Sequence, residues 1–244
     1  MRRFYCKSEN ITDNSIVFDK DETAHIKKVL RLSPGEEIIV SDGTGEDYLC
    51  VLTECAEKCV AKINGKVKNE NEPQTNVILF QAVIKNEKMD LVIQKAAELG
   101  ITKIVPVITA RTVVKIEDAK KELHKNERWQ KIALEACKQC GRSKVPEVCS
   151  AMSLKEAIKL YSACETKIVA YEEEKTQSIT KAVTKTESVG YFIGPEGGIT
   201  EEEHSLLVSA GGVSVSLGKR ILRAETAAIA CGAVIMALTG EMDV

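Results

Sequence analysis

Two glycine-bearing loops near the end of the chain carry the residue types best suited to chemistry. Residues 194–198 read Gly-Pro-Glu-Gly-Gly, and residues 217–226 read Leu-Gly-Lys-Arg-Ile-Leu-Arg-Ala-Glu-Thr. Each loop follows a short apolar run and leads to a Thr or a Glu-Thr pair that can open a helix. Glycine lets a ligand lie against bare backbone, and Pro195 stiffens the first loop. We therefore predict a preformed cradle for a flat or polar small molecule at the carboxyl ends of sheet strands.

The first loop alone leaves an alternative open, because Gly and Pro most often mark turns. It could be only a turn before a helix capped by Thr200. The second loop favours a ligand site because it mixes apolar and basic side chains, which suits the gripping of an aromatic ring. These side chains are Leu217, Ile221 and Leu222, with Lys219, Arg220 and Arg223. Neither loop has the spacing of a phosphate-binding loop or of a dinucleotide-binding fingerprint.

The composition is that of an ordinary globular protein, with 44% apolar and 29% charged residues among 244. Its net charge of −2 does not indicate a nucleic-acid binder, so any such contact must come from a local basic face. Apolar residues 227–238 are too few to span a bilayer. Because Met1-Arg2-Arg3 leads directly into Phe4-Tyr5, we expect no signal peptide and a cytoplasmic location.

The nine cysteines are scattered, and Cys137 and Cys140 form the one Cys-x-x-Cys pair. A zinc site would need a second such pair or a matching pair of histidines, and the sequence has neither. Reduced thiols are the favoured interpretation, with a metal or redox role for this pair as the alternative.

Residues 1–72 are predicted to form a small β-rich domain. Short apolar or alternating runs are separated by turn signals such as Asp42-Gly43 and Asn64-Gly65, and an amphipathic helix at 21–32 interrupts them. Strands at this spacing favour a compact barrel. The polar run 66–75 is predicted to be a linker.

Residues 73–244 are predicted to form a second domain of alternating strands and helices. Strands are expected at 77–84, 101–108 and 167–170, and helices at 87–99, 118–139 and 153–163, the last with Ser153 as its N-cap. This alternation predicts an α/β fold with a mostly parallel sheet and helices on both faces. The last helix is apolar nearly all round, so we expect burial on more than one side and a homodimer.

The two loops together resemble the paired signature of the SPOUT methyltransferases, and the chain is most similar to the ribosomal small-subunit methyltransferase E family. The resemblance covers nearly the whole chain and implies an S-adenosylmethionine-dependent enzyme that makes N3-methyluridine in 16S ribosomal RNA. It also implies a PUA-like RNA-binding barrel in residues 1–72, a C-terminal trefoil knot and a homodimer. Sequence periodicity could not reveal a knot, and base rates oppose one.

The resemblance also implies roles for individual residues. Cofactor-binding residues are expected at Glu172, Gly194, Pro195, Glu196, Gly197, Gly198, Leu217, Gly218, Ile221, Leu222, Thr226 and Ala227. RNA contacts are expected at Arg3, His25, Arg31, Arg111, Gln139 and Arg142, from four matching blocks that include residues 111–114 and 135–143. For Arg142, residue chemistry alone leaves another role open, as a cation at the carboxyl end of a helix.

Arg223 and Glu225 are the candidate catalytic residues. Deprotonated uracil carries charge on O2 and O4, and a guanidinium is the natural group to stabilise it. Glu225 could orient Arg223, cap the last helix or act as a base. The first two roles are favoured because an ordinary carboxylate is a weak base.

Two other functions stay open from the sequence. One is a SPOUT 2′-O-ribose methyltransferase, against which the PUA-like start argues. The other is a non-catalytic RNA-binding assembly factor, which the intact glycine loops disfavour. One departure from the family is Lys219, where many members have proline, so this loop is expected to be less rigid.

Overall fold

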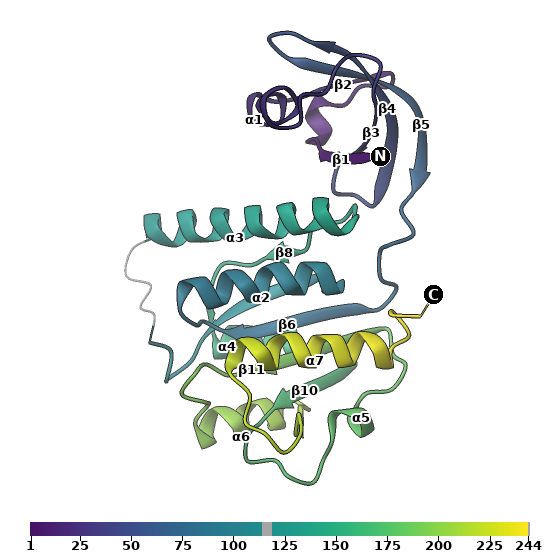
Figure 1. Cartoon of the computed structure of the whole chain (residues 1–244). Coiled ribbons are helices and arrows are strands. Elements are labelled where there is room, and N and C mark those ends of the chain that lie inside the picture. The colour runs from purple at the N-terminus through teal and green to yellow at the C-terminus, as the bar shows by residue number, and fades with distance from the viewer. Residues whose placement is uncertain (114–118, 244) are drawn as a thin grey trace. The chain divides into compact units, whose positions relative to one another are not determined.

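The computed structural model describes residues 1–113 and 119–243, and it divides into two compact units (Figure 1). The first unit comprises Met1–Glu72 together with Cys137–Val145, and the second comprises Pro73–Ala136 and Pro146–Val244. The return of Cys137–Val145 to the first unit was not indicated by the sequence. Val114, in one of the family blocks, and Asp118, the expected start of a helix, lie outside the described residues.

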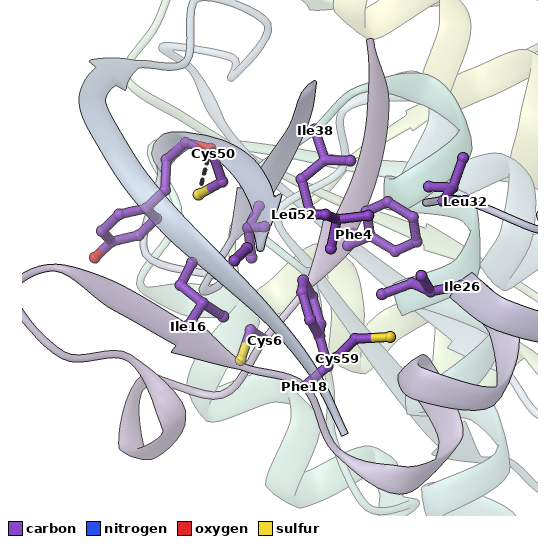
Figure 2. Close-up of a cluster of buried hydrophobic side chains, with 13 residues drawn as sticks. Phe4, Cys6, Ile16, Phe18, Ile26, Leu32, Ile38, Cys50, Leu52 and Cys59 are labelled. Atoms are coloured by element: carbon purple, nitrogen blue, oxygen red, sulfur yellow. Dashed lines mark hydrogen bonds between the residues drawn. The ribbon is translucent and has the colours of Figure 1, made fainter. Parts of the chain in front are cut away.

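The first unit is a five-stranded mixed sheet with strand order β1-β3-β4-β5-β2. Its strands are β1 (Arg2–Tyr5), β2 (Ser15–Val17), β3 (Glu37–Ser41), β4 (Glu46–Cys55) and β5 (Cys59–Lys68). β1 runs parallel to β3, and the other pairs are antiparallel. The two edge strands, β1 and β2, contribute to one core. The ring of Phe4 in β1 and the ring of Phe18, directly after β2, lie edge to face with centroids 5.8 Å apart (Figure 2). The sheet therefore curls around its apolar side chains.

The helical segment of this unit is shorter and less regular than the sequence predicts. A 3-10 turn, η1 (Ser8–Asn10), precedes it. The helix α1 (Lys20–Ala24) begins after Asp19, whose Oδ1 accepts a hydrogen bond from the Glu22 backbone at 2.8 Å. It continues as a π-helical turn, η2 (His25–Val29), and Arg31 then adopts φ 53°. Left-handed backbone cannot continue a helix, so the expected extension to Leu32 is wrong.

Asn64-Gly65 was expected to mark a turn, and this prediction is wrong. β5 continues through both residues, with Gly65 paired to Leu49 and Ile63 paired to Cys50. Asn64 is therefore the extra residue of a β-bulge, which is another position where Gly and Asn are favoured. The local sequence could not separate the two because both break a regular strand.

The polar run 66–75 is more ordered than its composition suggests. β5 extends to Lys68, and the buried Asn69 donates from Nδ2 to Asp47 Oδ2 and to the Gly141 carbonyl, each at 2.9 Å. Glu72 Oε1 accepts hydrogen bonds from the backbone of Ser143 at 2.7 Å and of Lys144 at 2.8 Å. The first part of the expected linker thus packs within the first unit.

The second unit is built on an all-parallel seven-stranded sheet with strand order β12-β10-β11-β6-β7-β8, in which β9 also pairs with β7. The strands are β6 (Asn76–Ala82), β7 (Lys103–Ile108), β8 (Glu147–Val148), β9 (Met152–Ser153), β10 (Thr166–Ala170), β11 (Ser188–Ile193) and β12 (Val213–Val215). The helices are α2 (Asn86–Leu99), α3 (Ala119–Cys140), α4 (Leu154–Ser162), α5 (Ile179–Ala182), α6 (Glu201–Ser209) and α7 (Ala224–Leu238).

Helices cover both faces of this sheet. On one face, Phe80 and Phe192 pack with Tyr161 of α4 and Leu207 of α6 in a single buried cluster. Successive side chains of a strand point to opposite faces. Tyr191, next to Phe192, accordingly meets the other pair of helices, and its hydroxyl donates to the Ala228 carbonyl of α7 at 3.5 Å. α2 packs against α7 on that face (Figure 1). The predicted fold class is confirmed.

The last helix buries one face in this chain rather than several. The buried residues are Ala224, Ala228, Cys231, Gly232, Ile235 and Met236. Apolar neighbours on the rest of the helix, among them Ile229, Ala233 and Val234, are only half-buried. The second buried side was expected at a subunit interface, and it stays a prediction.

Side-chain caps determine where α4 and α6 begin. Ser153 and Thr200 each accept a hydrogen bond from the backbone three residues later, and Glu156 and Glu203 return one. Thr200 closes the first glycine loop, so its cap both begins α6 and ends the loop. The prediction of these N-caps is confirmed.

We expect Thr200→Ala to destabilise the protein by about 1 kcal/mol, because the first turn of α6 loses an acceptor for its free backbone N–H groups. Denaturant unfolding measures the change. Thr200→Ser keeps the hydroxyl and should unfold close to the parent. Equal loss in both variants would mean that the methyl group, and not the cap, is what matters.

Candidate active site

A cavity of about 1280 Å³ opens where three neighbouring parallel strands end. Ala170 ends β10, Ile193 ends β11 and Val215 ends β12, and all three line the cavity. Loops 171–178, 194–198 and 216–223 supply most of its remaining wall. The carboxyl ends of parallel strands meet at one edge of a sheet, which is the usual ligand position in open α/β folds.

The first glycine loop is held in one shape by its neighbours. Gly198 has φ 70°, and a Cβ at this position would collide with Oε1 of Glu172. The Gly198 N–H donates to the Pro195 carbonyl at 2.9 Å, and Arg111 Nη1 donates to the Gly197 carbonyl at 2.8 Å. Only glycine combines this backbone with the close approach of Glu172. The sequence predicted a shaped loop, and the structure contains one.

The second loop carries exposed apolar and basic side chains along the cavity wall. Ile221 is 89% exposed, which is unusual for so large an apolar side chain, whereas Leu217 and Leu222 are half-buried. Lys219 and Arg220 line the same wall and are exposed. Ser216 steadies the turn, because its hydroxyl accepts from the Gly218 N–H at 3.3 Å and donates to the Gly218 carbonyl at 3.2 Å.

The start of α7 places the two candidate catalytic residues differently. Arg223 occupies the N-cap position of α7, is exposed and lines the cavity. Glu225 is behind the wall, with its side chain 12% exposed and its carboxylate 3.6 Å from Lys88 Nζ. In the described part of the chain no hydrogen bond joins Glu225 to Arg223. Arg223, and not Glu225, is therefore the N-cap residue, and the carboxylate faces Lys88 instead.

Most of the expected cofactor residues surround one cavity. Eleven of the twelve line it, and the exception is Thr226, which is exposed in the first turn of α7. Sequence reasoning missed Lys88 and the segment 173–178, which also line it. The sequence around Lys88 did not indicate a site residue, because a lysine in the first turn of a helix is usually a solvent-exposed charge.

The missed segment contains a tight turn built on one carboxylate. Glu174 Oε1 accepts hydrogen bonds from the Thr176 N–H at 2.7 Å, from the Thr176 hydroxyl at 2.6 Å and from the Gln177 N–H at 2.9 Å. The Thr176 hydroxyl bond and these backbone bonds lower the pKa of Glu174 from 4.5 to about 2. The turn thus depends on an ionised carboxylate at the cavity wall.

We expect this turn to lose stability as the pH falls from about 4.5 to about 2. The sign follows from the depressed pKa: the folded state favours the ionised form, so its advantage is complete above the unfolded pKa and disappears on protonation. A carboxyl chemical-shift titration should find Glu174 near 2, and Thr176→Val should raise that pKa. An unchanged midpoint in the variant would exclude the hydroxyl as the main cause.

The residues expected to contact RNA are divided between the two units. Arg111 belongs to the second unit, where it holds the first glycine loop. The other five belong to the first unit, and two of these make internal ion pairs. Arg3 forms a bidentate pair with Asp47, and Arg142, only 4% exposed, pairs with Glu72 at 3.1 Å. His25, Arg31 and Gln139 are half-buried or exposed.

Cys137 and Cys140 belong to the first unit, and neither forms a disulfide with another described cysteine. Burial raises the pKa of Cys137 to about 12, which disfavours a reactive thiolate. Within residues 1–113 and 119–243, no group of three or more His, Cys, Asp or Glu side chains could hold a metal ion. In the same residues, no helix has the length and apolar character needed to cross a membrane.

Two family models match the chain. One, described as the RNA methyltransferase domain, matches residues 70–236, and the other, the RNA methyltransferase PUA domain, matches residues 18–63. The first match covers the parallel sheet and both glycine loops. The class defined by fold and site is therefore that of the RNA methyltransferases.

Individual relatives narrow this class. The ribosomal RNA small subunit methyltransferase E of Bacillus subtilis is 36% identical over 215 residues, which are 85% of this chain and 84% of the relative. The enzyme of the same name from Neisseria gonorrhoeae, solved with S-adenosyl methionine, gives a TM-score of 0.88 with 33% identity over 98% of each chain. A Legionella pneumophila protein, solved with SAM, gives 0.89 with 30% identity over 96% of each chain. The chain belongs to the ribosomal RNA small subunit methyltransferase E family, and the predicted resemblance is confirmed.

Proposed function

We propose that this chain transfers a methyl group from S-adenosylmethionine to N3 of a uridine in 16S ribosomal RNA. The named relatives support the substrate class, and the Neisseria gonorrhoeae structure with S-adenosyl methionine supports the methyl donor. The observation that carries the proposal is the cavity at the ends of β10, β11 and β12, with the Arg223 guanidinium on its wall.

The residues that line the cavity suit the binding of S-adenosylmethionine. Gly198 lacks the Cβ that would strike Glu172, so this carboxylate can lie against the glycine loop at the cavity wall. The backbone of loops 194–198 and 217–222 and of Ala227 would hold the donor, with Glu172 near its ribose. Ile221 and Leu222 provide the apolar surface for its base. When bound, S-adenosylmethionine supplies an electrophilic methyl group on a sulfonium.

The methyl acceptor, N3 of uridine, must be made accessible and must lose its proton before it can react. N3 of uridine lies on the Watson–Crick edge and carries a proton at neutral pH, so the base must be unpaired or flipped out and must lose that proton. As the proton leaves, negative charge spreads onto O2 and O4. Arg223 is exposed on the cavity wall, and in this proposal the fixed donors of its guanidinium stabilise the negative charge on O2 and O4. Much of the remaining rate enhancement comes from holding N3 of the uridine in line with the methyl group of the donor.

Glu225 serves this site from behind the cavity wall. It lies in the first turn of α7, where a carboxylate interacts favourably with the positive end of the helix. Only Ala224 separates it from Arg223, so its position and that of the guanidinium are linked through the helix start. We assign Glu225 a supporting role.

RNA binding is proposed for the PUA-like unit, with His25, Arg31 and Gln139 as contacts that its surface presents. Arg3 and Arg142 would have to leave their ion pairs to reach RNA. The half-buried apolar side of α7 supports a homodimer in which a second copy covers it. Domain boundaries at 1–72 and 73–244, the knot and a cytoplasmic location complete the proposal.

Transfer of labelled methyl from S-adenosylmethionine tests the substrate class. Small ribosomal subunits that lack the modification should accept label in 16S ribosomal RNA, and large subunits should not. Label confined to large subunits, or none in either while the donor binds, would contradict the proposal.

A further inference from the structure

Lys88 lies between two carboxylates that come from different elements of the site. It belongs to the first turn of α2, and its Nζ is 3.1 Å from Glu196 Oε1 and 3.6 Å from Glu225 Oε2. Glu196 is part of the first glycine loop, and Glu225 is in the first turn of α7. One ammonium therefore joins three elements, α2, the glycine loop and α7.

The burial of the Glu225 carboxylate makes the Lys88 ammonium important. Glu225 Oε2 is buried and has no hydrogen-bond partner in the described structure, so the nearby Lys88 charge is what compensates it. A buried charge that loses its partner is costly, and two carboxylates that converge without a cation repel each other. Burial raises the pKa of Glu196, but a hydrogen bond to its own backbone and the bond to Lys88 outweigh this, so that its pKa lies below the usual value.

We propose that Lys88 is a positioning residue that fixes the first glycine loop and the start of α7 relative to each other. α2 packs against α7, so Lys88 projects from a rigid support. It binds Glu196 within the donor loop and Glu225 two residues beyond Arg223. By holding both, it sets the distance between the proposed donor cradle and the proposed catalytic guanidinium. The functional part of this inference rests on the proposed methyltransferase activity.

A second lysine on the same helix provides a matched control. Lys95 of α2 bonds to Glu98 three residues later at 2.8 Å, and both belong to one helix. The pair is half-buried, as the Lys88–Glu196 pair is, but it lies within one helix, so it contributes little and orders no other element. Lys95 does not line the cavity.

We expect Lys88→Ala to lower kcat by roughly 10- to 100-fold, as a misplaced catalytic group does, and to weaken S-adenosylmethionine binding measured by calorimetry. KM for the RNA should change much less, because the two carboxylates that Lys88 binds belong to the proposed donor site. Lys88→Arg keeps the charge and should recover most of kcat, and Lys95→Ala should resemble the parent. Equal kcat and donor affinity in Lys88→Ala and Lys95→Ala would overturn the inference.

A double-mutant cycle with thermal unfolding tests the charge pairing without donor or RNA. Glu225→Gln should lower the unfolding midpoint of the parent, which keeps Lys88, and raise it in the Lys88→Ala background, where the carboxylate is uncompensated. Additive shifts would contradict the pairing. If the parent binds no donor, the proposed function fails, whereas the cycle still decides whether Lys88 compensates Glu225.

Discussion

Arg223→Ala is expected to lose about two to three orders of magnitude in kcat, the usual cost of removing one preorganised donor from a site of developing charge. The guanidinium is exposed on the cavity wall, and no described side chain binds it. Since most proposed donor contacts come from the backbone of the two loops, the affinity for S-adenosylmethionine should change far less than kcat. Single-turnover methyl transfer, with calorimetry of donor binding, measures the two effects separately.

The matched variants make this expectation specific. Arg223→Lys keeps the charge without the planar fork of donors and should recover only part of the rate. Arg128→Ala removes another arginine of the second unit, which pairs with Asp90 outside the cavity, and should leave kcat unchanged. Methyl transfer at the parent rate by Arg223→Ala would show that another group stabilises the uracil charge.

Gly198→Ala is expected to weaken S-adenosylmethionine binding about tenfold or more, because left-handed backbone costs a residue with a Cβ roughly 1–2 kcal/mol. In addition, the new Cβ would displace the Glu172 carboxylate. Glu172 ends a flexible side chain and can move, but it would then leave the place where the proposal puts the donor ribose. Calorimetric titration with S-adenosylmethionine measures the loss.

Gly35→Ala is the control for backbone strain. Gly35 has φ 95°, a Cβ there would meet nothing within 4 Å, and the residue belongs to the first unit. Its variant should lose stability and keep the parent's donor affinity. If both alanine variants weakened donor binding equally, general destabilisation and not the shape of the glycine loop would be the cause.

Local patterns predicted those features that local chemistry determines. The capping residues Ser153 and Thr200 begin helices as expected, because an N-cap needs only a hydroxyl and the next three residues. The strand and helix alternation after residue 76 likewise follows from short-range periodicity. Both glycine loops were expected at the carboxyl ends of strands, whereas the order that sets the ends of β10, β11 and β12 side by side was not predicted.

Features that depend on distant partners escaped prediction. Lys88 and Glu225 are far apart in the sequence, and no spacing rule links them. Arg142 was expected near RNA and is buried against Glu72, a pairing that exists because Cys137–Val145 packs within the first unit. Asn64-Gly65 was expected to form a turn, but Asn64 lies in a β-bulge. The two features favour the same residues, so the sequence indicated an irregularity without identifying its kind.

The most direct test of the central claim is nucleoside analysis of 16S ribosomal RNA from small subunits treated with the enzyme and labelled S-adenosylmethionine. The account predicts that the label is recovered as 3-methyluridine and that Arg223→Ala nearly abolishes it. Recovery as a 2′-O-methylated nucleoside would contradict the account, because the methyl group would then be on the ribose and the proposed role of Arg223 in stabilising the uracil anion would have no basis.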